Sequence, residues 1–221
     1  MTKFGVVFLL VLLICGVLAI TQPRATAGEA ADPGVAANGR LTALIGAMLV
    51  VLLVAIAVTT LYLPAFLDAH YLVGLLLVPP VLLKVATTGY RFGRYYTGSP
   101  AYRLAGPPPE LLRWFVAPAL VASAVAVFAT GIELWLFGLR FGFAWRSLHT
   151  ISAVIFVLAA GAHMVGHLRQ SADAVGDEAR VKSNREVFTR RSAVVASLLL
   201  GLVLAAASLL YVSPFPSAIA G

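Results

Sequence analysis

Charged residues are scarce in this 221-residue chain. Asp, Glu, Lys and Arg together make up 11% of it, whereas hydrophobic residues make up 61%. A soluble domain uses about 25% charged residues to solvate its surface. The composition therefore excludes a soluble globular protein and indicates an integral membrane protein.

Cysteine and catalytic signatures are also scarce. Cys15 is the single cysteine, which excludes intramolecular disulfides and CxxC metal sites. The chain has no Rossmann or P-loop glycine pattern, and no serine stands in a nucleophile-elbow context. The formal charge of +7 is spread over the connecting segments rather than gathered on one basic face, so we expect no nucleic-acid partner.

Long apolar runs are abundant. Runs near or above the roughly 18 residues that cross a bilayer occupy 4–20, 41–67, 70–88, 114–137, 148–168 and 193–211. They predict an all-α fold, a polytopic transmembrane helix bundle of about six membrane segments around a four- to five-helix core. Residues 1–40 have the pattern of a signal-anchor-like helix and linker, and residues 41–221 that of the transmembrane bundle.

Lysine and arginine predict the direction of each segment. They gather in two connections, at Arg91, Arg94, Arg103 and Arg113 and at Arg169, Arg180, Lys182, Arg185, Arg190 and Arg191. The positive-inside rule places both connections in the cytoplasm, which predicts a multi-pass plasma-membrane protein with an extracytoplasmic C-terminus. Ala25-Thr26-Ala27 is also typical of a signal-peptide cleavage site. Cleavage there would place the arginine-rich connections outside, so we expect segment 4–20 to be retained.

Three of the four histidines lie on segment 148–168. Because a helix turns about 100° per residue, His149, His163 and His167 share one face, with His149 at the outer end. His70 opens segment 70–88, which runs in the same direction, so His70 and His149 are expected to face each other near the outer surface. Two imidazoles from facing helices are the axial ligands of a six-coordinate b-type haem. We therefore expect one haem per chain between these helices.

Small residues are frequent on segments 114–137 and 148–168. They would line the slot that a porphyrin edge needs between the helices. Small residues also simply let membrane helices pack closely, and the sequence alone does not separate the two explanations.

Three further groups are candidates for chemistry. Lys84 follows His70 by 14 residues, as His163 follows His149. It would neutralise a haem propionate, ligate a metal, or extend to the inner headgroups, and we favour the last. His163 and His167 have the i, i+4 spacing of a two-histidine metal site, without the glutamate of a zinc-protease motif. Glu133 would hydrogen-bond a ligand imidazole, relay protons to a quinone, or simply reach interfacial water.

Two stretches carry a resemblance to known proteins, "AHYLVGLLLVPPVLLKVATTGYRFGRYYTGSPAYR" and "LHTISAVIFVLAAGAHMVGHL". They resemble a family of small actinobacterial membrane proteins and, more distantly, the cytochrome b subunits of formate dehydrogenases and nickel hydrogenases. The resemblance covers about residues 40–212. It implies that histidines ligate b haems and pass electrons between a quinone and a soluble oxidoreductase subunit. This chain has too few histidines for two complete bis-histidine sites.

Three hypotheses for the function stay open at this point. The first is a b-type haem electron-transfer protein with His70 and His149 as ligands, acting as a subunit rather than a stand-alone enzyme. The second is a structural or assembly membrane protein without a cofactor. The third is a metal-handling or proton-coupled transporter that uses the groups listed above: His163, His167, Lys84 and Glu133.

Overall fold

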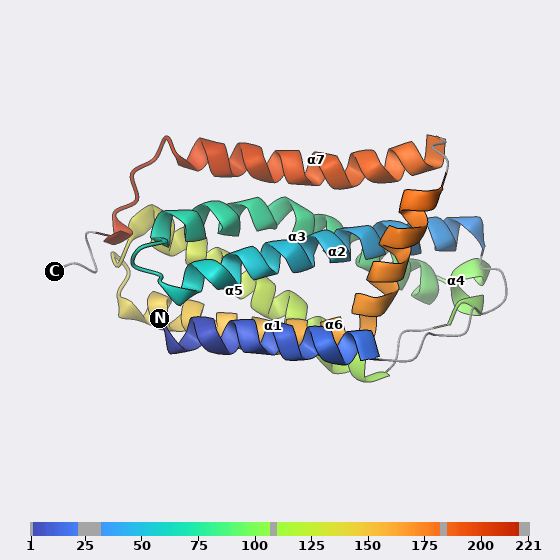
Figure 1. Ribbon diagram of the computed structural model, residues 1–221, viewed down its shortest axis with the longest axis horizontal. Helices are drawn as coiled ribbons and strands as arrows, with labels where there is room; N and C mark the ends of the chain where they lie inside the picture. The colour runs from blue at the N-terminus through green and yellow to red at the C-terminus, as the bar shows by residue number, and fades with distance from the viewer. Residues whose placement is uncertain (1, 22–31, 107–109, 182–184, 217–221) are drawn as a thin grey trace.

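The computed structural model describes residues 2–21, 32–106, 110–181 and 185–216 (Figure 1). These residues form seven α-helices and one π-helical stretch, and none of them lies in a strand. The elements are α1 (Lys3–Thr21), α2 (Pro33–Leu61), α3 (Leu67–Tyr96), α4 (Pro100–Leu104), η1 (Leu112–Val116), α5 (Ala117–Phe137), α6 (Phe143–Arg180) and α7 (Arg185–Ser208). Among the described residues, six helices are long and apolar enough to cross a membrane, with η1 continuing into α5. The predicted all-α membrane bundle is confirmed.

Four helices surround the interior of the bundle. α2 and α5 each pack against both α3 and α6, so they hold the two histidine-bearing helices in a fixed relation. α1 packs against α2 and α6, and α7 packs against α3 and α2. The four- to five-helix core predicted from the sequence thus corresponds to a ring of α2, α3, α5 and α6, flanked by α1 and α7.

The outer faces of the bundle are apolar. Leu200 and Val203 of α7 and Leu13 of α1 are more than half exposed, whereas Phe8 and Leu12 of α1 are buried against the core. In water, such faces would promote aggregation, whereas lipid tails solvate them. The exposed apolar faces support a multi-pass membrane protein.

The ends of the helices depend on local capping. The Asp32 side chain accepts hydrogen bonds from the first backbone N–H groups of α2, and Pro33 takes the first helical position. α2 therefore begins at Pro33, before the apolar run 41–67. Between α5 and α6, Gly138 and Gly142 adopt φ of 63° and 97°, which only glycine adopts without strain. This tight connection fixes the start of α6 next to the end of α5.

α3 and α6 extend well beyond the C-terminal ends of the apolar segments predicted for them. α3 continues past 88 to Tyr96, and α6 continues past 168 to Arg180. At 1.5 Å per residue α6 is about 57 Å long, well beyond the ~30 Å of a hydrocarbon core. In Figure 1 its last part, drawn in orange, runs across the end of the bundle toward α7. There the buried Glu178 pairs with Arg190 of α7, with an N–O distance of 3.0 Å.

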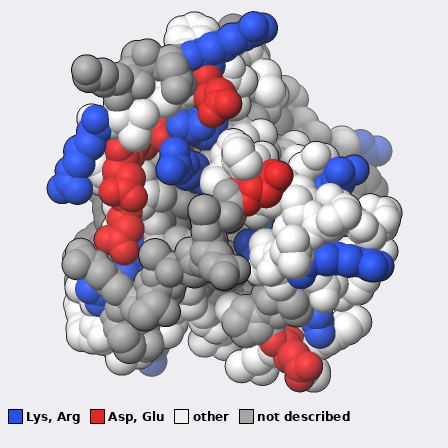
Figure 2. All heavy atoms as spheres, turned by 90° about the vertical axis from the view of Figure 1, so that its right-hand side faces the viewer, with Lys and Arg blue, Asp and Glu red and all other residues white. Residues whose placement is uncertain are grey.

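Charged side chains gather at the end of the bundle where α4 lies, as the space-filling view of that end shows (Figure 2). The arginines of α3 and α4 and the Glu178–Arg190 pair belong to this end. α1 begins and α7 ends at the opposite end (Figure 1). We call the end that carries α4 the arginine-rich end.

Candidate functional site

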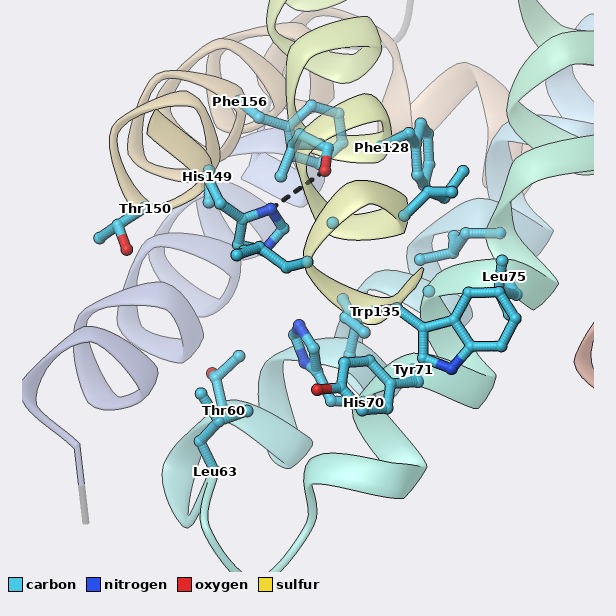
Figure 3. A pocket seen from close by; sticks show the side chains of 18 of the residues that line it. Thr60, Leu63, His70, Tyr71, Leu75, Phe128, Trp135, His149, Thr150 and Phe156 are labelled. Atoms are coloured by element: carbon cyan, nitrogen blue, oxygen red, sulfur yellow. Dashed lines mark hydrogen bonds between the residues drawn. The ribbon is translucent and has the colours of Figure 1, made fainter. Parts of the chain in front are cut away.

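His70 of α3 and His149 of α6 face each other across the interior of the helix ring (Figure 3). Their ring centroids are 6.4 Å apart and their planes lie at 84° to each other. The contact that the sequence predicted between these two histidines is therefore present. It lies toward the end of the bundle where α1 begins and α7 ends.

The two histidines border a cavity of about 300 Å³. Most of its wall is aliphatic or aromatic, with Phe128 of α5 and Phe156 of α6 among the labelled residues in Figure 3. Gly74 also lines it, and a Cβ there would meet nothing within 4 Å. Among the described residues that line the cavity, only Arg146 carries a full charge. Apolar cavities of this size with a few convergent polar groups are typical of cofactor and ligand sites.

Hydrogen bonds fix how each imidazole presents its nitrogens. Nδ1 of His70 lies 3.0 Å from Thr59 Oγ1, whose own hydroxyl donates to Ile56 O. Thr59 Oγ1 must therefore accept, and Nδ1 of His70 carries the proton. The Nε2 atom of His70 is then left with a free lone pair.

The arrangement repeats at His149. Its Nδ1 lies 3.1 Å from both Val127 O and Thr130 Oγ1. A carbonyl oxygen only accepts, and the Thr130 hydroxyl already donates to Ala126 O. His149 therefore also carries its proton on Nδ1, which leaves Nε2 unprotonated. Metal-ligating histidines are oriented in this way, with the outer N–H held by a second group and the other nitrogen free to bind.

The distance between the two ring centroids can be compared with that of two imidazoles bound to one metal ion. Imidazole–metal bonds are about 2 Å long, so two rings that ligate one ion from opposite sides have centroids roughly 6 Å apart. The observed 6.4 Å agrees with that spacing. Close packing maintains it from one side, because a Cβ at Gly131 would come within 3.0 Å of His149 Cε1.

Glu133 does not support either histidine. Among the described residues, neither of its carboxylate oxygens has a hydrogen-bond partner, and it does not line the cavity. Thr59 and Thr130 occupy the role that the sequence assigned to Glu133 as partner of a ligand imidazole, so that interpretation of Glu133 is wrong. The two oxygens of Glu133 are nevertheless shielded within the protein.

Lys84, His163 and His167 lie toward the arginine-rich end. His163 and His167 have ring centroids 4.6 Å apart. Lys84 Nζ donates to Thr42 O of α2 at 2.6 Å. The ammonium group of Lys84 therefore lies against a neighbouring helix, and its extension to the headgroups stays a prediction. Among the described residues no three His, Cys, Asp or Glu side chains come together, so His163 and His167 form a pair without a third ligand of this kind.

Thr59 and Thr130 were not singled out from the sequence, although a signal was present. Thr59 and His70 are nearly equidistant from the connection between α2 and α3, and Thr130 and His149 are nearly equidistant from the connection between α5 and α6. In an antiparallel helix pair such positions lie at the same depth. A threonine opposite each histidine is therefore a pattern that the sequence already contains.

Fold and site together define a multi-pass helical membrane bundle with two opposed histidines at an internal cavity. No family model matches the chain, and no curated protein or solved structure matches it either. The resemblance to cytochrome b subunits accordingly stays a prediction.

Proposed function

We propose that this protein is a membrane-embedded b-type haem electron-transfer protein, with His70 and His149 as the two axial ligands. The observation that carries the proposal is the opposition of the two imidazoles at 6.4 Å across an apolar cavity. The protonated Nδ1 atoms add support, because they leave both Nε2 atoms available to the metal.

Other residues of the chain would support the bound haem. Thr59 and Thr130 hold the imidazoles in the ligating tautomer. Phe128 and Phe156 keep water from the cavity. Arg146 supplies a positive charge for a haem propionate. A bound b-type haem exchanges one electron at a time.

The exchange partners follow from the same proposal. We infer a quinone in the bilayer or a soluble oxidoreductase subunit, as in the proteins that the sequence resembles. Binding of haem says nothing of a catalysed reaction, so the proposal is that of an electron-transfer subunit rather than of a complete enzyme.

Alanine variants of the two ligands test the proposal. His70→Ala and His149→Ala, purified from haem-replete cells, are each expected to lose most of the haem that the unaltered protein contains. His167→Ala is the matched control, because it removes an imidazole far from the cavity and should retain haem. Unchanged haem in both ligand variants would show that the ligand assignment is wrong.

The orientation in the membrane is part of the proposal. We infer that the arginine-rich end lies in the cytoplasm of a bacterial cell and that the C-terminus is extracytoplasmic, because cytoplasmic connections carry the excess of Lys and Arg. In a Cys15→Ser background, Val212→Cys should react with a membrane-impermeant maleimide in intact cells. Ser99→Cys should react only after the membrane is permeabilised, and the reverse pattern would contradict the orientation.

A further inference from the structure

A second polar group lies between α2, α3 and α6 toward the arginine-rich end. It comprises Lys84 of α3, His163, His167 and Ser171 of α6, and Gly46 of α2, and we call it the inner cluster. A Cβ at Gly46 would lie 3.0 Å from Lys84 Nζ and 3.2 Å from Ser171 Oγ. The side chains of α3 and α6 therefore converge on a position of α2 that has no side chain.

The inner cluster is rich in donors, and none of its five members is a carboxylate. Lys84 lies within electrostatic range of both imidazoles, and Arg91 within range of His167. An ammonium group has three N–H donors, and Thr42 O is its single acceptor among the described residues. Two ion pairs of the described residues join Glu178 to Arg190 and Arg191, and neither involves Lys84. A charged side chain inside a membrane bundle is costly, which makes it a candidate for function.

This chemistry disfavours a metal ion. Lys84 and Arg91 would repel a divalent cation, and two imidazoles without a carboxylate are a poor set of ligands for it. An oxyanion fits the same groups well, because ammonium, imidazole N–H and hydroxyl donors all form charge-assisted or ordinary hydrogen bonds with phosphate or carboxylate oxygens.

We propose that the inner cluster is a binding site for an oxyanion, a phosphate or carboxylate group. Lys84 follows His70 by 14 residues along α3, which is about 21 Å, so the cluster lies near the inner boundary of a ~30 Å hydrocarbon core. At that depth both the phosphate of an anionic lipid headgroup and a free anion from the cytoplasm reach it. The site is independent of the proposed haem site.

Two probes distinguish the sources of the oxyanion. The first is inorganic phosphate, added to the purified full-length protein in neutral detergent while the midpoint of thermal unfolding is followed. The second is phosphatidylglycerol in nanodiscs, with retention of the lipid measured by native mass spectrometry. A saturable rise of the midpoint with phosphate supports a free anion. Retained phosphatidylglycerol without that rise supports a headgroup.

Lys84→Met is the decisive variant, because it keeps the length of the side chain and removes its charge. It should weaken binding of the active probe by roughly tenfold or more, since a charge-assisted hydrogen bond is lost. Lys3→Met, the same substitution at an exposed lysine of α1, should bind as the unaltered protein does. If Lys84→Met fails to fold, His167→Gln tests the same site.

The proposal is overturned if neither probe binds, or if Lys84→Met or the substitute His167→Gln binds as tightly as the unaltered protein. Haem content measured on the same samples separates this result from the haem proposal. If the unaltered protein binds no anion but contains haem, only the proposal for the inner cluster fails. If it binds the anion but contains no haem, only the proposal for His70 and His149 fails.

Discussion

His70 and His149 stand with their ring planes at 84° and their ring centroids 6.4 Å apart, each with its Nδ1 atom engaged by a threonine. Two histidines that only stabilised the bundle would be expected to hydrogen-bond through both nitrogens. In these two histidines only Nδ1 is hydrogen-bonded among the described residues, and both rings face a cavity. The relationship is better explained by a shared ligand than by packing alone.

Gly74→Ala separates an occupied cavity from an empty one. The added methyl group meets no protein atom within 4 Å and points into open space at the cavity wall. In a protein without a cofactor, alanine should raise helix stability by up to about 1 kcal/mol. If haem fills the cavity, Gly74→Ala should instead lower the haem-loaded fraction. Gly89→Ala, also in open space on α3 but away from the cavity, is the control and should leave haem unchanged.

Thr59→Val and Thr130→Val should affect the two ligands unequally. Valine keeps the shape of threonine and removes the acceptor for Nδ1–H. His149 still has Val127 O, whereas Thr59 Oγ1 is the hydrogen-bond partner of His70 Nδ1 among the described residues, so Thr59→Val should weaken haem binding more. The loss expected for such a supporting group is about 10-fold or more. Thr42→Val on α2 controls for the substitution itself, and equal effects of all three variants would contradict the assignment.

The prediction of the His70–His149 contact from sequence succeeded because depth in a membrane is set by position along a helix. Matching helix starts and alternating directions were enough to bring the two residues to one level. Helix ends were less predictable. Hydropathy marks the part of a helix that lies in lipid, whereas the ends of α3 and α6 depend on contacts and caps in water.

The direction of a side chain was not predictable in the same way. Lys84 at the end of an apolar run is typical of a residue that extends to the headgroups. Its contact with α2 depends on Gly46 of that helix, which leaves room for the ammonium group beside Thr42 O. Pairwise contacts of this kind require the three-dimensional packing, and hydropathy contains no information about them.

Gly201→Ala tests the packing of α7 against α3. A Cβ at Gly201 would collide with the backbone carbonyl of Leu76, which cannot rotate away as a side chain would. We expect a loss of about 1–3 kcal/mol, as for overpacked core sites, seen as a lower midpoint of thermal unfolding in detergent. Gly16→Ala meets nothing within 4 Å and should not lower the midpoint. An equally stable Gly201→Ala variant would show that α7 does not pack this closely.

Arg146→Gln tests the one full charge at the cavity. A positive charge near the haem favours the reduced form, so its removal should lower the midpoint potential by some tens of millivolts. Arg140→Gln lies at the same end of the bundle but does not line the cavity, and it should change the potential much less. A potential that responds equally to both variants would argue against contact between Arg146 and a propionate.

The central claim is tested most directly by a dithionite-reduced minus oxidised absorbance spectrum of the protein, purified in mild detergent from haem-replete cells, together with a pyridine haemochrome assay. The account predicts a sharp low-spin b-type signal and close to one haem per chain. A colourless protein would contradict it and leave His70 and His149 as structural groups of the bundle.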